Sequence, residues 1–155
     1  MMNTTANDAI ESVRAFMTAL DSNDLDTAAG YLDDQFIFSG WTPRDMSGQE
    51  LLNVIKGLKE GIPDLQFNLY DVQGHDNTVD ATIQVTGHQS DSFILPTLGL
   101  PPIPQTDNNV SLPTEEVSYL VSNGHIARWD ARRGKDVGVL GILHQLGIEV
   151  PGFAM

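Results

Sequence analysis

A carboxylate beside a tryptophan near the end of the chain is the best candidate for chemistry. Asp130 follows Trp129 in a segment whose polar and apolar residues alternate, which predicts a strand. A carboxyl group enclosed by apolar walls, or placed beside a second carboxyl group, has a raised pKa. Such a group can take a proton from carbon, or return one, near neutral pH. We therefore predict that Asp130 is an acid/base group and that Arg128, on the same strand face, holds an enolate or carboxylate oxygen.

The turn before this strand decides which residue lies opposite Asp130. Asn123-Gly124 is a strong hairpin signal, so the two segments around it are predicted to pair. A three-residue loop places Glu116 directly across from Asp130. A two-residue loop instead places Val117 and Tyr119 on the Asp130 face. Both turn types suit Asn-Gly, and the sequence leaves the register open.

Arg128 and Asp130 also allow a purely structural interpretation, and His88 is a further candidate residue. Arg128 and Asp130 could form an ion pair at the rim, with Glu116 in solvent, and this arrangement would have no catalytic role. His88 ends another predicted strand, where it is a second candidate acid/base group or a ligand hydrogen-bond donor. A single histidine at a strand end is more often structural.

The elements that must position these residues follow from periodicity and from end signals. Ser47 and Glu50 form a capping box at the start of one helix, and Gly61 stands where a C-terminal cap belongs. Gly147 ends the last helix. We predict helices over 8–21, 24–33, 47–61 and 136–146, strands over 36–38, 65–69, 79–85, 114–121 and 125–132, and a Pro-rich loop over 96–113. For the first helix, Asn7 or Thr5 is the predicted cap.

Helices come first and a run of antiparallel strands follows, an order that predicts an α+β fold. The chain of 155 residues has the size of a single domain, 1–155. Trp41, Phe38 and Ile55 are predicted to line an apolar pocket together with Tyr119 and Arg128.

Composition excludes several kinds of function. The formal net charge of -13 repels phosphate backbones and anionic lipids, so we expect neither nucleic acid nor a membrane as a partner. The chain has no cysteine and four scattered histidines, so no metal site is expected. It lacks a Gly-rich phosphate loop and a dinucleotide fingerprint, and we expect no cofactor. Without a secretory signal or a long apolar run, the expected location is the cytoplasm.

Several short motifs occur in order over residues 8–147. They are Tyr31-Leu32-Asp33-Asp34-Gln35-Phe36, Ser47-Gly48-Gln49-Glu50, Ile62-Pro63-Asp64-Leu65, Thr86-Gly87-His88, the Pro-rich segment, Asn123-Gly124-His125-Ile126 and His144-Gln145-Leu146-Gly147. In this order they resemble the SnoaL-like polyketide cyclase family of the nuclear transport factor 2-like superfamily.

The resemblance implies a cone-shaped fold, in which a curved antiparallel sheet is wrapped by about three N-terminal helices around a hydrophobic pocket, with a short C-terminal helix. It also implies ring closure by an intramolecular aldol reaction without a cofactor, and a homodimer formed through the sheet. Asp130 stands at the position of the family's acid/base aspartate. Glu116 stands where the family has an assisting histidine, and the basic 131–135 stretch also departs from the family pattern.

The sequence therefore predicts a cofactor-independent acid/base enzyme for a small hydrophobic carbonyl compound, with Asp130, Glu116 and His88 as the catalytic residues. The alternative is a non-catalytic domain of the same fold that binds a hydrophobic small molecule. A third interpretation is an interaction module that works through its sheet. A buried Asp130 carboxyl that is free to meet a ligand favours catalysis, whereas one held by two or more hydrogen bonds favours binding.

Overall fold

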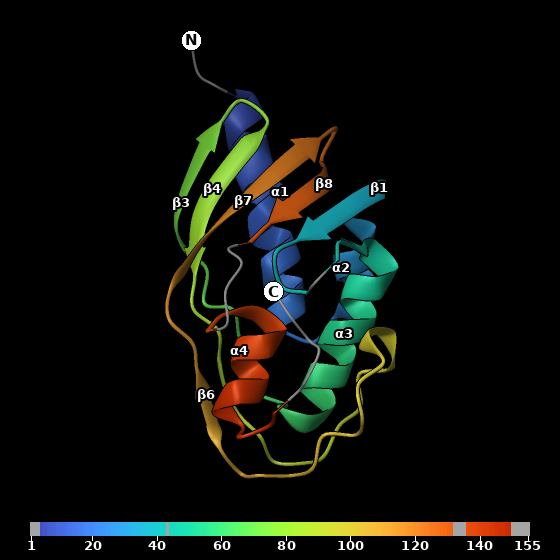
Figure 1. The fold of residues 1–155 in the computed structure, drawn as a ribbon. Helices are drawn as coiled ribbons and strands as arrows, with labels where there is room; N and C mark the ends of the chain where they lie inside the picture. The colour runs from blue at the N-terminus through green and yellow to red at the C-terminus, as the bar shows by residue number, and fades with distance from the viewer. Residues whose placement is uncertain (1–3, 43, 132–135, 150–155) are drawn as a thin grey trace.

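The computed structural model describes residues 4–42, 44–131 and 136–149, and its main feature is a curved six-stranded sheet (Figure 1). The strand order is β2-β1-β8-β7-β4-β3, and all neighbours are antiparallel except β1 and β8. Its strands are β1 Leu32–Ser39, β2 Met46–Ser47, β3 Tyr70–His75, β4 Thr78–Ile83, β7 Glu115–Ser122 and β8 His125–Asp130. A two-stranded sheet joins β5 Thr86–His88 to β6 Asn109–Ser111.

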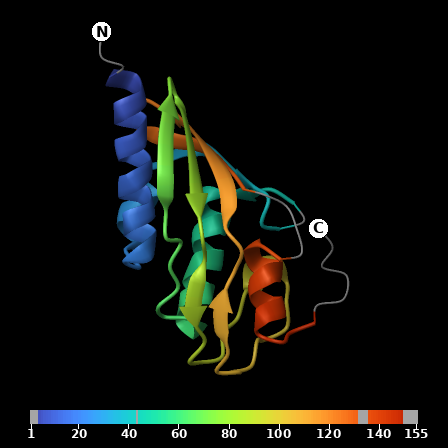
Figure 2. The ribbon, with the colours of Figure 1, turned by 90° about the vertical axis from the view of Figure 1, so that its left-hand side faces the viewer.

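Helices cover one face of the sheet and close the end of the molecule. They are α1 Thr4–Asp21, α2 Leu25–Gly30, α3 Gly48–Gly61 and α4 Gly138–Gln145, with a short 3-10 turn, η1, over Pro96–Leu98. Helix α1 packs across β3, β4, β7 and β8, while α3 packs against β1 and β2. Figure 2 shows α1 and α4 on opposite sides of the molecule. The predicted α+β class, with N-terminal helices and a short C-terminal helix, is confirmed.

Helix α3 begins as predicted and ends for a different reason. The Glu50 N–H donates to Ser47 Oγ (3.2 Å), and the Ser47 N–H donates to Glu50 Oε1 (3.0 Å), which completes the capping box. Gly61 is the last helical residue and is not in the left-handed conformation of a cap. A Cβ atom there would collide with the Phe93 ring, so close packing explains this glycine.

Several segments differ from the sequence-based prediction. The predicted 24–33 helix ends at Gly30, and its last residues belong to β1. The predicted 96–113 loop contains η1 and the strand β6.

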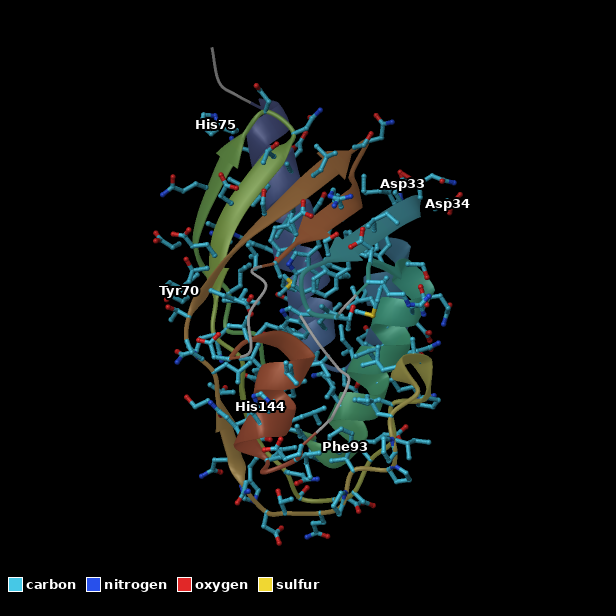
Figure 3. The ribbon with its side chains drawn as sticks, viewed as in Figure 1. Asp33, Asp34, Tyr70, His75, Phe93 and His144 are labelled. Carbon is cyan, nitrogen blue, oxygen red and sulfur yellow. The ribbon has the colours of Figure 1, made fainter. Side chains whose placement is uncertain are left out.

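The first helix already includes Thr4, so Thr5 and Asn7 lie inside it and cannot be its cap. The predicted 65–69 strand is irregular, and pairing with β4 starts only at Tyr70. Asn68 has a positive φ of 51°, which interrupts the extended backbone just before β3. Figure 3 shows Tyr70 and His75 projecting from this edge of the sheet.

The Pro-rich segment is fastened to the rest of the molecule by polar and apolar contacts. Gln89 is fully buried, and its amide donates to the Pro104 carbonyl (2.8 Å) while its oxygen accepts from the Thr106 N–H (2.8 Å). Phe93 and Ile103 exchange two backbone hydrogen bonds. These bonds hold the loop against the end of α3, where Phe93 is labelled in Figure 3.

Helix α4 is attached to β6 by one side chain of the closing motif. Gln145 Oε1 accepts from the Ser111 N–H (2.6 Å), and its Nε2 donates to the Ser111 carbonyl (2.9 Å). Gly147, with a φ of 80°, follows the helix as predicted. Over the described ranges, no helix is both long enough and apolar enough to cross a membrane.

Candidate functional site

The β7–β8 hairpin has a register that neither predicted loop provides. Its turn is Asn123-Gly124, and Ser122 pairs with His125. The register then shifts by one, because Ala127 bulges out of β8 and has no partner on β7. Ser118 consequently lies opposite Asp130.

This register divides the hairpin into an inner face, turned toward α1, and an outer face. Glu115, Val117, Tyr119, Val121 and Trp129 are buried on the inner face. The outer face carries exposed or half-buried residues, which are Glu116, Ser118, Leu120, Arg128 and Asp130.

Asp130 lies on the outer face, where its carboxylate forms an ion pair with Arg128. Arg128 Nε donates to both carboxylate oxygens of Asp130, at 2.9 and 3.0 Å. Arg128 Nη2 donates to Ser39 Oγ (3.0 Å), and that hydroxyl donates to Asp45 (2.7 Å). The Arg128 and Asp130 side chains are 42% and 46% exposed. The structure thus shows the rim ion pair, with two hydrogen bonds to the Asp130 carboxylate.

A shallow hollow of about 630 Å³ lies on the outer face across β3, β4, β7 and β8. Its walls include four acidic residues, Asp71, Asp80, Glu116 and Asp130. Glu116 is exposed and is two residues along the strand from Ser118, on the Asp130 face. The surroundings of both predicted carboxylates are therefore polar and open.

His88 lies in the other sheet, away from the hairpin. Its N–H donates to Asp64 Oδ1 (2.8 Å), and its ring Nδ1 shares a hydrogen bond with Asn109 Oδ1 (2.7 Å). It is exposed. The structure does not bring His88 together with Asp130.

The inner face contributes to an aromatic cluster whose centre is Trp129. The rings packed around Trp129 have centroids 4.6 to 6.3 Å from its own. The cluster consists of Phe16, Phe38, Trp41, Phe67, Tyr119 and Trp129. Four residues predicted to line a pocket, Trp41, Tyr119, Phe38 and Ile55, are all at most 1% exposed. These four residues lie in the core, whereas Asp130 and Arg128 lie on the outer face of the sheet.

A carboxylate that the sequence reasoning missed reaches this cluster. Glu115 is 2% exposed on the inner face, and its Oε1 accepts a hydrogen bond from Trp41 Nε1 (3.3 Å). The sequence does contain a pattern that predicts the burial of Glu115, because the apolar residues Val117, Tyr119 and Val121 occupy alternate positions along β7. Extending that alternation backwards places Glu115 inside and Glu116 outside.

Tyr119 adds a second ionisable group to the interior. Its hydroxyl donates to Met17 Sδ (3.4 Å). Burial raises the pKa of Tyr119 well above its usual value, and the charges of Glu115 and Asp21 raise it further. Tyr119 therefore keeps its proton and acts in the cluster as a neutral group. In the parts of the chain that the structure describes, no group of three or more His, Cys, Asp or Glu could hold a metal ion.

Solved structures share this fold at low sequence identity. A putative SnoaL-like polyketide cyclase from Jannaschia sp. CCS1 is 13% identical with a TM-score of 0.72, over 94% of this chain and 96% of that one. AclR, a putative hydroxylase from Streptomyces galilaeus, is 15% identical with a TM-score of 0.71, over 92% and 97%. A LEH-like epoxide hydrolase from M. tuberculosis is 17% identical with a TM-score of 0.62, over 92% and 94%. At this identity the similarity concerns the fold, and a shared fold does not fix the reaction.

Sequence comparison identifies the family. No curated protein matches the chain in sequence. The model of the SnoaL-like domain matches residues 13–129, from α1 to the tryptophan at the centre of the aromatic cluster. That match covers more than half of the chain and includes Glu115 and both faces of the β7–β8 hairpin up to Trp129. The chain therefore belongs to the SnoaL-like domain family.

Proposed function

We propose that this protein is a cofactor-independent acid/base enzyme for a small hydrophobic carbonyl compound, and that Glu115 is its acid/base group. The observation that carries the proposal is the position of Glu115. It is a carboxylate turned into an aromatic interior, on the strand next to the one that carries Trp129. Family membership supports cyclase-type chemistry in general.

The surroundings of Glu115 suit a carbanion reaction. Aromatic rings provide an apolar surface for a ring-bearing ketone and keep water away from it. The Trp41 indole N–H fixes the direction of the carboxylate through its hydrogen bond to Oε1. A fixed carboxylate in a water-poor site needs little reorganisation when it takes a proton.

The proposed reaction is an enolisation followed by ring closure. The C–H bond next to the ketone breaks, its proton passes to the Glu115 carboxylate, and the electron pair forms an enolate. The enolate carbon then attacks a second carbonyl carbon of the same molecule to form a C–C bond. The resulting alkoxide takes a proton from the Glu115 carboxyl, so the product is an isomer of the substrate and no cofactor is consumed.

Deuterium exchange tests the first step without knowledge of the natural substrate. The wild-type protein is incubated in D₂O with small aromatic ketones such as 1-tetralone, and loss of the α-proton is followed by NMR. We expect Glu115→Gln to slow the exchange by about 10² to 10⁴-fold, the usual contribution of a general base. Gln can still accept the Trp41 hydrogen bond, so the fold should survive.

Glu116→Gln is the matched control, because the same chemical change is made one residue along the strand on the outer face. We expect its exchange rate to stay near the wild-type rate. Equal rates for Glu115→Gln and the wild type would contradict the proposal. A slow Glu116→Gln or Asp130→Asn variant would instead support the sequence-based assignment of the acid/base group.

A second candidate function is that of a non-catalytic domain that binds hydrophobic small molecules. The two hydrogen bonds from Arg128 to the Asp130 carboxylate favour it, because they leave that group poorly placed for proton transfer. Binding of 1-tetralone by the wild type with no exchange above the buffer rate would select this function. We further propose that the protein acts in the cytoplasm and, on the family resemblance, that it forms a homodimer through its sheet.

A further inference from the structure

The two tryptophans of the interior differ in their hydrogen bonding. Trp41 Nε1 donates to Glu115. Trp129 is 0% exposed, and its Nε1 has no hydrogen-bond acceptor among the described residues. Buried N–H groups almost always have an acceptor in native proteins, so an unpartnered one calls for an explanation.

None of the rings packed around Trp129 accepts a hydrogen bond from its Nε1. The rings of Phe16, Phe38 and Phe67 have no oxygen or nitrogen atom. The Tyr119 ring stacks on Trp129 at a centroid distance of 5.3 Å, and its hydroxyl donates to Met17 Sδ and makes no hydrogen bond with the indole. An acceptor from outside the protein would satisfy the indole.

The unpartnered donor and the buried carboxylate flank the same side chain. The Trp41 indole bonds Glu115 at 3.3 Å, and its ring lies 6.3 Å from the Trp129 ring between centroids. Trp129 pairs with Tyr119 across the two strands, and Tyr119 shares the inner face of β7 with Glu115. A ligand that meets both groups would therefore lie against the Trp41 ring.

We infer that Trp129 Nε1 donates a hydrogen bond to the carbonyl oxygen of the ligand, which is a ring-bearing ketone. This inference rests on the proposed function and extends it, because it names the group that recognises the oxygen. The same N–H stabilises the negative charge when that oxygen becomes an enolate. An apolar ligand without an oxygen would leave the indole unpartnered, so the site prefers the ketone over the matching hydrocarbon.

The test uses 1-tetralone and tetralin, which have the same two rings and differ in the carbonyl group. The chain has two tryptophans, so the ¹⁵N-labelled protein gives two indole N–H signals. Trp41→Phe and Trp129→Phe identify them. We expect 1-tetralone to move the Trp129 indole proton downfield, as a new hydrogen bond does, and tetralin to leave it without such a shift.

Affinity provides the second measurement. Trp129→Phe keeps an aromatic ring and removes the donor, so we expect it to bind 1-tetralone about tenfold more weakly, the usual effect of one lost hydrogen bond. Its affinity for tetralin should change less than that. The melting temperature of this variant shows whether it remains folded. If the variant unfolds, the shift of the Trp129 indole proton in the wild type still tests whether this N–H donates to the ketone.

Three results would overturn the inference: no binding of 1-tetralone by the wild type, binding without a downfield shift of the Trp129 proton, or unchanged affinity in a folded Trp129→Phe variant. The Glu115→Gln variant separates this inference from the proposed function. If Glu115 is not the base, this variant keeps its exchange rate and the indole shift is unaffected. If Trp129 is not the donor, the shift is absent although Glu115→Gln still abolishes exchange.

Discussion

The inner and outer faces of the β7–β8 hairpin place neighbouring residues in opposite environments. Glu115 is buried next to Trp41, whereas Glu116 is exposed. Trp129 is surrounded by rings, whereas Asp130 is 46% exposed and paired with Arg128. A carboxylate on the outer face is screened by water, while one on the inner face acts on its neighbours at a lower effective dielectric constant. Consecutive residues of a strand therefore have opposite surroundings.

The largest predicted difference between the faces is in stability. Trp129→Ala leaves a large cavity in the aromatic cluster, and we expect it to lower the free energy of unfolding by about 3 to 5 kcal/mol. Arg128→Ala removes a partly exposed ion pair with Asp130, for which about 0 to 1 kcal/mol is expected. Urea unfolding of both variants measures the difference. Similar losses in the two variants would mean that the faces are not energetically distinct.

An intermediate effect is expected from Tyr119 at alkaline pH. Its pKa is raised well above 10.0 in the folded protein, so the folded state keeps a proton that the unfolded chain releases above pH 10. The stability contribution of the neutral hydroxyl is therefore complete below pH 10 and is lost as the pH rises. Above pH 10, the titration of Tyr119 should lower the free energy of unfolding by about 1.4 kcal/mol per pH unit.

Tyr119→Phe removes this titration and keeps the ring. We expect its urea unfolding curves to show a shallower loss of stability between pH 10 and pH 11 than the wild type. Parallel losses in both proteins would indicate that the buried hydroxyl does not carry the effect.

The smallest predicted effect concerns association through the outer face. Asp71, Asp80 and Glu116 line the hollow there, and a homodimer formed through the sheet would bring two such sets of charges together. Salt screens this repulsion, so raising the ionic strength from 0.01 to 0.5 M should tighten the dimer by a few-fold. Sedimentation measures the dissociation constant. A dimer weakened by salt, or a monomer at every salt concentration, would argue against this interface.

Elements with local signals were predictable from the sequence. A few consecutive residues determine each of three such features. They are the capping box at Ser47 and Glu50, the Asn123-Gly124 turn and the end of α4 before Gly147. The reason for a glycine at position 61 is its contact with Phe93, which is distant in the sequence, so neighbouring residues could not predict it.

The pairing across the β7–β8 hairpin was harder to predict, because it depends on one bulge. Ala127 shows no sequence feature that marks it as an extra residue, yet it sets which residues pair between the strands. The presence of Trp129 next to Asp130 suggested an apolar environment for the carboxylate. In a strand the two side chains point to opposite faces, so the buried tryptophan instead indicates an outward Asp130.

The comparison of Glu115→Gln with Asp130→Asn in ketone deuterium exchange tests the central claim, that chemistry belongs to the inner face. Both changes replace a carboxylate with its amide, and both variants are first shown to be folded by their melting temperatures. We predict that Asp130→Asn exchanges the α-proton of 1-tetralone at close to the wild-type rate and that Glu115→Gln is slower by about 10²-fold or more. A slow Asp130→Asn variant beside an unaffected Glu115→Gln variant would contradict this account and return the acid/base role to the outer face.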